Sequence, residues 1–460
     1  MRVRARWALL ALVAALVAAV VVVGLVVVNA RSRSAGVSSA APSASAAPGT
    51  PRPTAEDVFY GNRTPYPVPT TPDAAAPVGF EPVFLQHLGR HGARTSIPGD
   101  HGERAGELWR RASAAGALTP LGVQLGPVLE ALDAATDRLG LGRLTTVGRD
   151  EQEGLGRRAG DRYADLWASA GSGDEVDVVT SGRTRTRQSA QGFVAGLTAT
   201  RPGLTVEPAR TDRRLLYFDT TDPTYRTFLA DDQGWRQAYA AATSGTDLEA
   251  VAQQVLGRLY TPTFVASIDD PLAEAKSLFE RYRSAPSLAD DVSTPVDMRP
   301  FVPAGAAAAF TFAEDARYFY SRGPGVAGTD ASHRAAQVLV DSFLTSAERR
   351  LAGGHTLAVL QFAHAEEVGP LAALLALPGS RPLASAQQVY RWGDSDYRTA
   401  AVLPLSATID WTVWRNEAGS VLVSVAENEV PTTLGRSCRE ADGEPGYYLL
   451  DELRRCLAAS

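Results

Sequence analysis

Cysteine is scarce in this chain, with two residues among 460. So few thiols exclude a small scaffold held together by several disulfides, and no His–Cys group with zinc-ligand spacing appears. Disordered and collagen-like chains are also excluded, because 45% of the residues are hydrophobic and 21% are charged. The sequence therefore predicts a substantial buried core, organised as one large domain or two ordinary ones.

The chain also has no excess of basic residues. It contains 45 Lys+Arg and 51 Asp+Glu, which gives a formal net charge of -6. Proteins that bind nucleic acids are basic over their binding face, so the sequence predicts no nucleic-acid partner. Residues 1–55 contain six arginines and no acidic residue, which leaves the remaining chain with a net charge of -12. Any anion-binding site in that acidic part must therefore be built from a local group of arginines.

Charged and polar side chains are absent from Trp7–Val28, a run of Ala, Val and Leu with one Trp and one Gly. As a helix this run is about 33 Å long, enough to span a bilayer. Its length favours a membrane anchor over a cleaved signal peptide, whose apolar region is about 7–15 residues. Val28-Asn29-Ala30 resembles a cleavage site, so a secreted protein is the alternative. Three arginines before the run predict a single-pass cell-membrane protein with its bulk outside.

Residues 31–55 are rich in Ser, Ala and Pro and have almost no aliphatic bulk. Such a segment cannot bury enough apolar surface to order itself, which predicts a disordered stalk and a folded unit over residues 56–460. Both cysteines of the chain, Cys438 and Cys456, lie near its carboxyl end. In an exported domain they favour one disulfide over a metal pair.

Short apolar runs alternate with helical patterns along the folded unit. Strands are expected at Pro82–His87, Val176–Thr180 and Thr356–Phe362. Helical spacing of apolar residues follows at Leu118–Leu139, Thr145–Ala168, Thr184–Leu197 and from about Glu366. This alternation predicts an α/β fold with a mostly parallel sheet flanked by helices, and a ligand at the carboxyl ends of the strands.

A mainly helical stretch at about 211–329 divides the expected α/β core into residues 80–210 and 330–460. Its helices are expected at Asp247–Tyr260, Leu272–Ser284 and Gly305–Arg322. We interpret it as an inserted helical subdomain. A hairpin of Ser406–Arg415 with Ser420–Ala426 and a helix near Leu449–Leu457 are expected to complete the chain.

The first chemical motif, Arg90-His91-Gly92-Ala93-Arg94, directly follows the first predicted strand. Two guanidinium groups flank an imidazole, and guanidinium forks match the oxygens of a phosphate. Gly92 allows the backbone to approach a ligand closely. The alternative interpretation is a basic surface turn with a hydrogen-bonded histidine.

Two further motifs follow the other two strands. Arg183, Arg185 and Arg187 open a helix at alternate positions, so they cannot share one face, and one of them is expected to contact a ligand. The alternative is a charge-rich helix start. His364-Ala365-Glu366-Glu367 combines an imidazole with carboxylates, which suits charge stabilisation and proton donation, or else a simple pairing at a helix amino terminus.

Together the three motifs resemble the histidine phosphatase superfamily, clade two, from about Pro82 to Cys456. Arg90-His91-Gly92-Ala93-Arg94 is similar to the family's arginine-histidine-glycine-x-arginine signature, and Leu144-Thr145-x-x-Gly148 to its next helix. His364-Ala365-Glu366 resembles the closing motif of the multiple inositol polyphosphate phosphatase branch, as does Leu216-Tyr217-Phe218-Asp219. Ser96 stands where the family usually has a proline, which puts the rigidity of that loop in question.

The resemblance implies a phosphoglycerate-mutase-like core and phosphoryl transfer through a phosphohistidine, with no metal and no other cofactor. In this reaction His91 is the nucleophile and Glu366, in preference to Glu367, is the proton donor. The groups implied to stabilise the transferred phosphate are His364, Arg90, Arg94 and Arg185. An acidic-to-neutral pH optimum is expected, because a nearby phosphate or desolvation raises the pKa of a carboxyl group.

The implied substrate is a phosphorylated small molecule, an inositol polyphosphate such as phytate. Such a polyanion requires further cations, for which the candidates are Arg183, Arg187, Arg213 and Arg214. A broad-specificity acid or sugar-phosphate phosphatase is one alternative. A surface protein that binds a phosphorylated ligand without turnover is a second, and a phosphotransferase is a third. The intact set of His91, His364 and Glu366 speaks against a mere binding protein.

Overall fold

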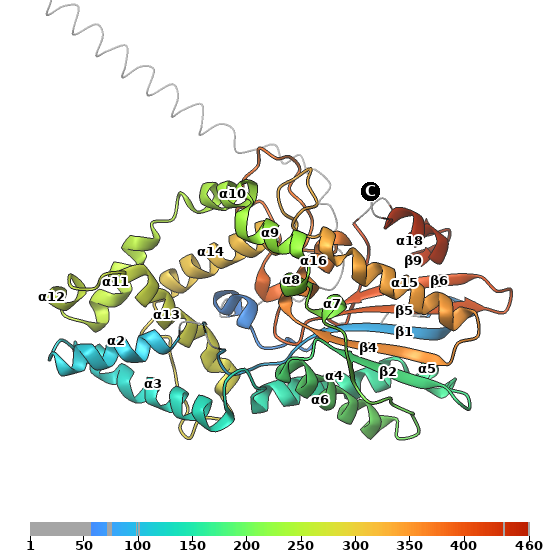
Figure 1. Ribbon diagram of the computed structural model, residues 1–460, viewed down its shortest axis with the longest axis horizontal. Helices are drawn as coiled ribbons and strands as arrows, with labels where there is room; N and C mark the ends of the chain where they lie inside the picture. The colour runs from blue at the N-terminus through green and yellow to red at the C-terminus, as the bar shows by residue number, and fades with distance from the viewer. Residues whose placement is uncertain (1–56, 71–75, 98, 100–101, 436–437, 459–460) are drawn as a thin grey trace, which may run out of the picture. The chain divides into compact units, whose positions relative to one another are not determined.

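A computed structural model describes residues 57–70, 76–97, 99, 102–435 and 438–458 (Figure 1). The membrane segment and the stalk expected from the sequence lie outside the described residues. Within the described part of the chain, no helix is long and apolar enough to cross a membrane. All described residues belong to one compact unit, residues 49–460.

A nine-stranded sheet forms the centre of this unit, in the order β3-β2-β4-β1-β5-β6-β9-β8 with β7 beside β6. β1 (Phe80–Arg90), β2 (Glu175–Thr180) and β4 (Thr356–Ala363) are the three strands expected from the sequence. They run parallel, with β4 between β1 and β2. All but the first residue of β4 are buried, as is typical of a central strand covered on both faces. The predicted α/β class is confirmed.

The second half of the sheet is antiparallel. β5 (Thr408–Asn416) pairs with β1 and forms the expected hairpin with β6 (Val421–Glu427). Strands joined by a short turn pair in antiparallel fashion, so the parallel part ends at β1. The remaining strands are β3 (Arg210–Thr211), β7 (Val430–Thr432), β8 (Glu440–Ala441) and β9 (Glu444–Leu449). A disulfide joins Cys438, before β8, to Cys456 of α18 (Leu450–Cys456), which confirms the expected bond.

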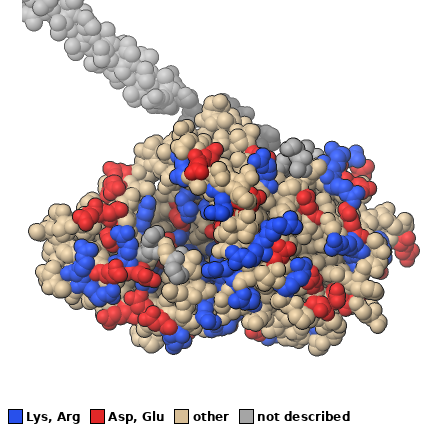
Figure 2. Space-filling model, viewed as in Figure 1, with Lys and Arg blue, Asp and Glu red and all other residues tan. Residues whose placement is uncertain are grey.

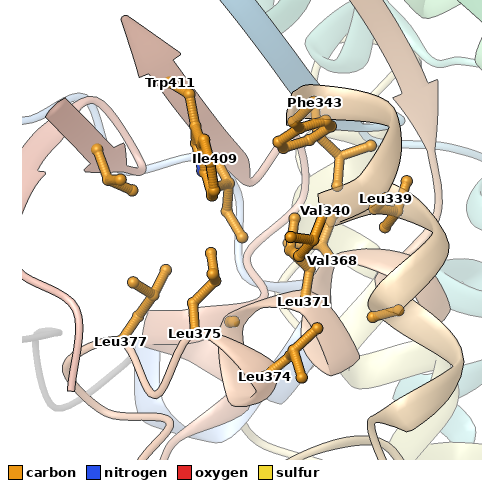
Figure 3. Close-up of a cluster of buried hydrophobic side chains, with 14 of the residues drawn as sticks. Leu339, Val340, Phe343, Val368, Leu371, Leu374, Leu375, Leu377, Ile409 and Trp411 are labelled. Carbon is orange, nitrogen blue, oxygen red and sulfur yellow. The ribbon is translucent and has the colours of Figure 1, made fainter. Parts of the chain in front are cut away.

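Helices cover both faces of the sheet (Figure 1). On one face lie α4 (Thr146–Arg162), α5 (Ala164–Ala168) and α6 (Thr184–Thr200). On the other lie α15 (Gln337–Leu351), α16 (Ala365–Leu374) and α18. Figure 3 shows the core beneath this second layer, where Phe343 of α15 and Leu371 of α16 face Trp411 of β5. The helices thereby fix β4 and the start of α16 in place.

A separate helical layer with its own hydrophobic core lies beside the sheet. It combines α11 (Leu248–Leu259), α13 (Pro271–Ser284) and α14 (Ala304–Arg322) with α2 (Glu103–Ala114) and α3 (Pro120–Leu139). The layer is therefore larger than the insert expected at 211–329, because the apolar faces of α2 and α3 join its core.

Shorter elements connect the two layers. They are η1 (Asp57–Arg63), α7 (Arg213–Leu216), α8 (Phe218–Thr221), α9 (Pro223–Asp231), α10 (Gln233–Thr243), α12 (Pro262–Val265), η2 (Ala285–Leu288), η3 (Arg334–Ala336) and α17 (Thr399–Val402). The aspartates Asp212, Asp222 and Asp232 accept hydrogen bonds from backbone N–H groups of α7, α9 and α10 and so fix where these helices begin.

Candidate active site

The carboxyl ends of β1, β2 and β4 bring the three chemical motifs together. Arg90 is in register with Ala363, and Thr180 with Phe362, so the residues that follow these strands meet at one edge. The rings of His91 and His364 lie with their centroids 5.4 Å apart. The structure thus places the two histidines singled out in the sequence side by side.

His91 is held as a neutral imidazole with one nitrogen free. Its Nδ1 lies 2.9 Å from the Gly92 carbonyl oxygen, and because a carbonyl only accepts, Nδ1 carries the proton. Nε2 then keeps its lone pair. Burial lowers the pKa of His91 well below its usual value, and the charges of Arg185 and Arg90 lower it further. The imidazole is therefore prepared to act as a nucleophile.

Two glycines and two side chains shape the loop around His91. A Cβ at Gly92 would overlap the backbone of Gly148, and a Cβ at Gly148 would overlap the backbone of Ala93, so neither position accepts a side chain. Ser189 of α6 accepts a hydrogen bond from the Gly92 N–H at 3.1 Å, and Glu151 of α4 accepts one from the Ala93 N–H at 2.8 Å. The loop is thus held against α4 and α6.

Three arginines expected at the site, Arg90, Arg94 and Arg185, are all buried. Arg90 donates to the carbonyl oxygens of Asn62 and Leu403, each at 2.6 Å. Burial lowers the pKa of Arg90 to about 10 and lowers that of Arg185. Among the described residues, the Nε atoms of Arg90 and Arg185 have no hydrogen-bond partner. Buried cations without full partners are costly, and a bound anion offsets that cost.

The two other arginines of the second motif differ in their surroundings. Arg183 precedes α6, and its charge lowers the pKa values of His364 and Arg185. Arg187 lies in the first turn of α6 and donates to the carbonyl oxygen of Gly182. Both side chains are exposed, so Arg183 acts on the site through its charge, whereas Arg187 is bonded to the backbone.

His364 stands between the strand end and two further side chains. Its Nε2 lies 2.8 Å from the Ser181 hydroxyl, and burial, followed by the charges of Arg185 and Arg94, lowers its pKa well below the usual value. The ring of Tyr217 lies 4.8 Å from the His364 ring. The guanidinium of Arg213 lies over the Tyr217 ring, 5.1 Å from its centroid. Without a ligand, His364 is therefore a neutral hydrogen-bonding group.

The two glutamates of the third motif have different roles. Tyr318 donates a hydrogen bond to Glu366 Oε1 at 3.3 Å. Burial raises the pKa of Glu366, but Arg322, Arg90 and Arg185 outweigh burial and leave it below the usual value. Glu367 is fully buried, and its Oε2 accepts the His364 N–H at 3.2 Å as a cap of α16. Glu366, which faces the arginines, has the position of a proton donor.

Comparison with known proteins identifies the family of this chain. A model of the histidine phosphatase superfamily, branch 2, matches residues 83–426. The chain belongs to this superfamily. The protein is therefore a histidine phosphatase, a phosphoric monoester hydrolase. None of the curated proteins compared with it shows significant similarity.

Solved structures show the same fold. The multiple inositol polyphosphate phosphatase of Bifidobacterium longum, in complex with inositol hexasulfate, matches with a TM-score of 0.80 at 24% identity. The match covers 87% of this chain and 97% of that one, and the complex with phosphate matches equally well. The phytase from D. castellii matches with a TM-score of 0.64 at 16% identity, over 87% and 84% of the two chains. The phosphatase thus has the fold of inositol polyphosphate phosphatases.

A cavity of about 340 Å³ opens in the helical layer of this phosphatase. Its walls combine apolar rings, Phe279 and Phe310, with the basic side chains of Arg104, Lys276 and Arg317. The Arg317 guanidinium lies 4.9 Å from the ring centroid of Tyr318, the side chain that donates to Glu366. The cavity is therefore adjacent to the reacting groups. Figure 2 shows this face hollowed near its middle, with basic side chains around the hollow.

These cavity residues were not predicted from the sequence. Lys276 is the one lysine of the chain, and that rarity was the only signal it carried. Arg104 and Arg317 lie on helices without a recognisable motif. Over the described ranges, no group of three or more His, Cys, Asp and Glu side chains has the arrangement of a metal site. Metal independence stays a prediction of the family resemblance.

Proposed function

We propose that this phosphatase hydrolyses inositol polyphosphates, phytate among them, through a phosphohistidine intermediate on the outer side of the cell membrane. The observation that carries the proposal is His91, a buried neutral imidazole with Nε2 free beside three buried arginines. The apolar amino-terminal run supports export, either as an anchored or as a secreted protein.

In the first step, Nε2 of His91 attacks the phosphorus atom and the bond to the leaving oxygen breaks. Arg90, Arg94 and Arg185 stabilise the charge on the phosphoryl oxygens, because fixed cations in a buried site need no reorganisation during the reaction. His364 and Ser181 contribute hydrogen-bonding groups. Glu366 transfers its proton to the leaving alkoxide, which departs as an alcohol.

In the second step, water attacks the phosphohistidine. The Glu366 carboxylate takes a proton from that water, inorganic phosphate forms, and the N–P bond to His91 breaks. Glu366 then holds a proton again, so the cycle needs no external acid. In the ligand-free protein the arginines lower the pKa of Glu366. A bound phosphate offsets their charge and restores the proton, which supports an acidic-to-neutral optimum.

The cations around the site support a substrate with several phosphates. Arg183 stands beside the reacting groups, and Arg104 and Lys276 line the adjacent cavity. The named structural neighbours act on or bind inositol derivatives of this kind. The rings of Phe279 and Phe310 favour a second candidate, a broad-specificity phosphatase that accepts esters of apolar alcohols.

The test measures phosphate release from phytate, para-nitrophenyl phosphate and glucose 1-phosphate from acidic to mildly basic pH, with and without chelator. Release from phytate through successively lower inositol phosphates is expected, with complete loss in His91→Ala. Release from the two monophosphates alone would favour the broad-specificity phosphatase. No release from any ester, together with tight binding of phytate, would identify a binding protein.

A further inference from the structure

Three carboxyl groups gather where α8 meets the amino terminus of α16. Glu366 and Glu367 open α16, and Asp219 lies in the first turn of α8. Glu366 and Glu367 both raise the negative potential at this point, and Asp219 interacts with each of them. The mechanism above uses Glu366 alone, so the other two carboxyl groups have no assigned role.

Glu367 has the surroundings of a protonated acid. Its Oε2 accepts the backbone N–H of His364, and both the backbone N–H and the carboxyl group of Asp219 act on its side chain. Glu367 Oε1 and Asp219 Oδ1 are buried oxygens with no hydrogen-bond partner within the described part of the chain. A proton on Glu367 supplies the donor that this pair otherwise lacks. Burial, Asp219 and Glu366 all raise the pKa of Glu367 well above its usual value.

Asp219 competes with Glu366 for the same cation. Arg322, at the end of α14, is the cation that lowers the pKa values of both carboxyl groups most, and Arg185 of α6 acts on both as well. Arg90 of β1 adds its charge at Glu366, and the hydroxyl groups of Tyr318 and Tyr225 face the group from α14 and α9. Burial and Glu366 raise the pKa of Asp219 to about 6.

We propose that Asp219 is a positioning residue that sets the proton affinity of Glu366, with Glu367 as a permanently protonated anchor between Asp219 and α16. When Asp219 is ionised it neutralises part of the field of Arg322, and Glu366 keeps its proton to a higher pH. This inference rests on the proposed role of Glu366 as the proton donor.

The test compares kcat against pH for the full chain and for Asp219→Asn, with phytate and with para-nitrophenyl phosphate. The basic limb of the phytate profile is expected to move down by about half a pH unit or more in Asp219→Asn, because Glu366 loses its proton sooner. The para-nitrophenyl phosphate profile is expected to move much less, since a nitrophenolate leaves without a proton. Glu367→Gln replaces the protonated acid with a neutral side chain of the same shape. Its phytate profile is expected to have the basic limb at the same pH as the wild type.

Glu366→Gln separates this inference from the proposed function. Its turnover of phytate is expected to fall far more than its turnover of para-nitrophenyl phosphate; equal retention of both would overturn the donor role and this inference with it. If Glu366→Gln behaves as expected and the limb of Asp219→Asn stays in place, the inference alone is wrong. A limb displaced equally by Glu367→Gln would also overturn it.

Should Asp219→Asn fail to fold, Arg322→Gln tests the same balance from the side of the cation. Removal of this charge is expected to move the basic limb of the phytate profile to higher pH, and an unmoved limb would contradict the inference.

Discussion

Gly148 is the residue at which α4 packs against the loop around His91, because a Cβ there would overlap the backbone of Ala93. Gly148→Ala is expected to displace the loop, abolish phosphatase activity and lower the free energy of unfolding by about 1–3 kcal/mol. Gly257 is a matched control, since it is a helical glycine of α11 with nothing near its Cβ position. Gly257→Ala is expected to stabilise the protein by about 0.5–1 kcal/mol. Phosphatase assays and chemical denaturation measure the effects of both substitutions. Equal effects of Gly148→Ala and Gly257→Ala would contradict the close packing of Gly148 against Ala93.

Lys276 is the cation of the cavity for which no ion pair with another described residue is present. Lys276→Met keeps the length of the side chain and removes its charge. The KM for phytate is expected to rise several-fold while kcat stays similar, because under the proposed function the ammonium group binds a phosphate that does not react. The KM for para-nitrophenyl phosphate, which has no second phosphate, is the control and is expected to stay unchanged. An equal rise in KM for phytate and for para-nitrophenyl phosphate would show that Lys276 does not bind a second phosphate.

At the scale of the element, strand β6 directs an acid into the core. Glu427 lies on the same face of β6 as Val423 and Val425, which belong to the large hydrophobic core. Burial alone raises the pKa of Glu427 to about 8 from 4.5. The protonated, buried carboxyl group makes its full contribution to the free energy of unfolding when the pH is below the pKa that glutamate has in the unfolded chain. That contribution is lost as the pH rises toward 8.

Glu427→Gln is therefore expected to raise the free energy of unfolding at neutral pH by up to about 3 kcal/mol, because the unfolded chain no longer gains from ionisation. At a pH below the ordinary glutamate value the difference is expected to vanish. Urea denaturation at the two pH values measures this change, and a difference independent of pH would show that the burial of charge is not its cause.

Most helices and strands with a clear periodicity of hydrophobic residues were predicted from the sequence. β2 and α6 begin within one residue of their predicted starts, since β-branched runs and helical spacing are strong local signals. α15 has apolar residues at helical spacing and was predictable by the same rule, although the prediction omitted it. α2 was not predictable in this way, because its five arginines and glutamates stand among few buried side chains, and only the helical layer gives it a partner.

The short motifs predicted which residues gather at the strand ends, but they did not predict the neighbours of those residues. Tyr318 and Arg322 lie on α14, and they reach Glu366 only because the helical layer packs against the strand ends. No spacing in the sequence encodes that contact, since it joins parts of the chain that are distant from one another. Tyr217 was noted within a family-like stretch, and its contact with His364 emerged only in three dimensions.

At the scale of the whole molecule, the disulfide closes the carboxyl-terminal end, where β8, β9 and α18 complete the sheet. The bond spans 18 residues and is expected to contribute about 3 kcal/mol. In Cys438→Ser with Cys456→Ser, the midpoint of thermal unfolding is expected to fall while kcat stays close to wild type, because no reacting group lies on these elements. Thermal scans with and without reductant measure the effect, and a reductant that leaves the midpoint unchanged would contradict it.

The net charge of the whole molecule differs in sign from the charge around the site. The folded part is acidic in total, yet three buried arginines stand at the strand ends with Arg183 beside them. Net charge bears on solubility and on partners such as nucleic acids, whereas a phosphate responds to the local field.

The position of β1 has a consequence for how the chain folds. His91, the proposed nucleophile, directly follows this strand, and both neighbours of the strand, β4 and β5, are made from residues hundreds of positions later. A chain emerging amino terminus first therefore presents β1 with two bare edges until β4 is complete at residue 363, and with one bare edge until β5 is complete at residue 416. High contact order of this kind slows folding and exposes intermediates to aggregation. Any truncation before β5 leaves β1 open on one side, so the amino-terminal part of the chain cannot complete the sheet around the site by itself.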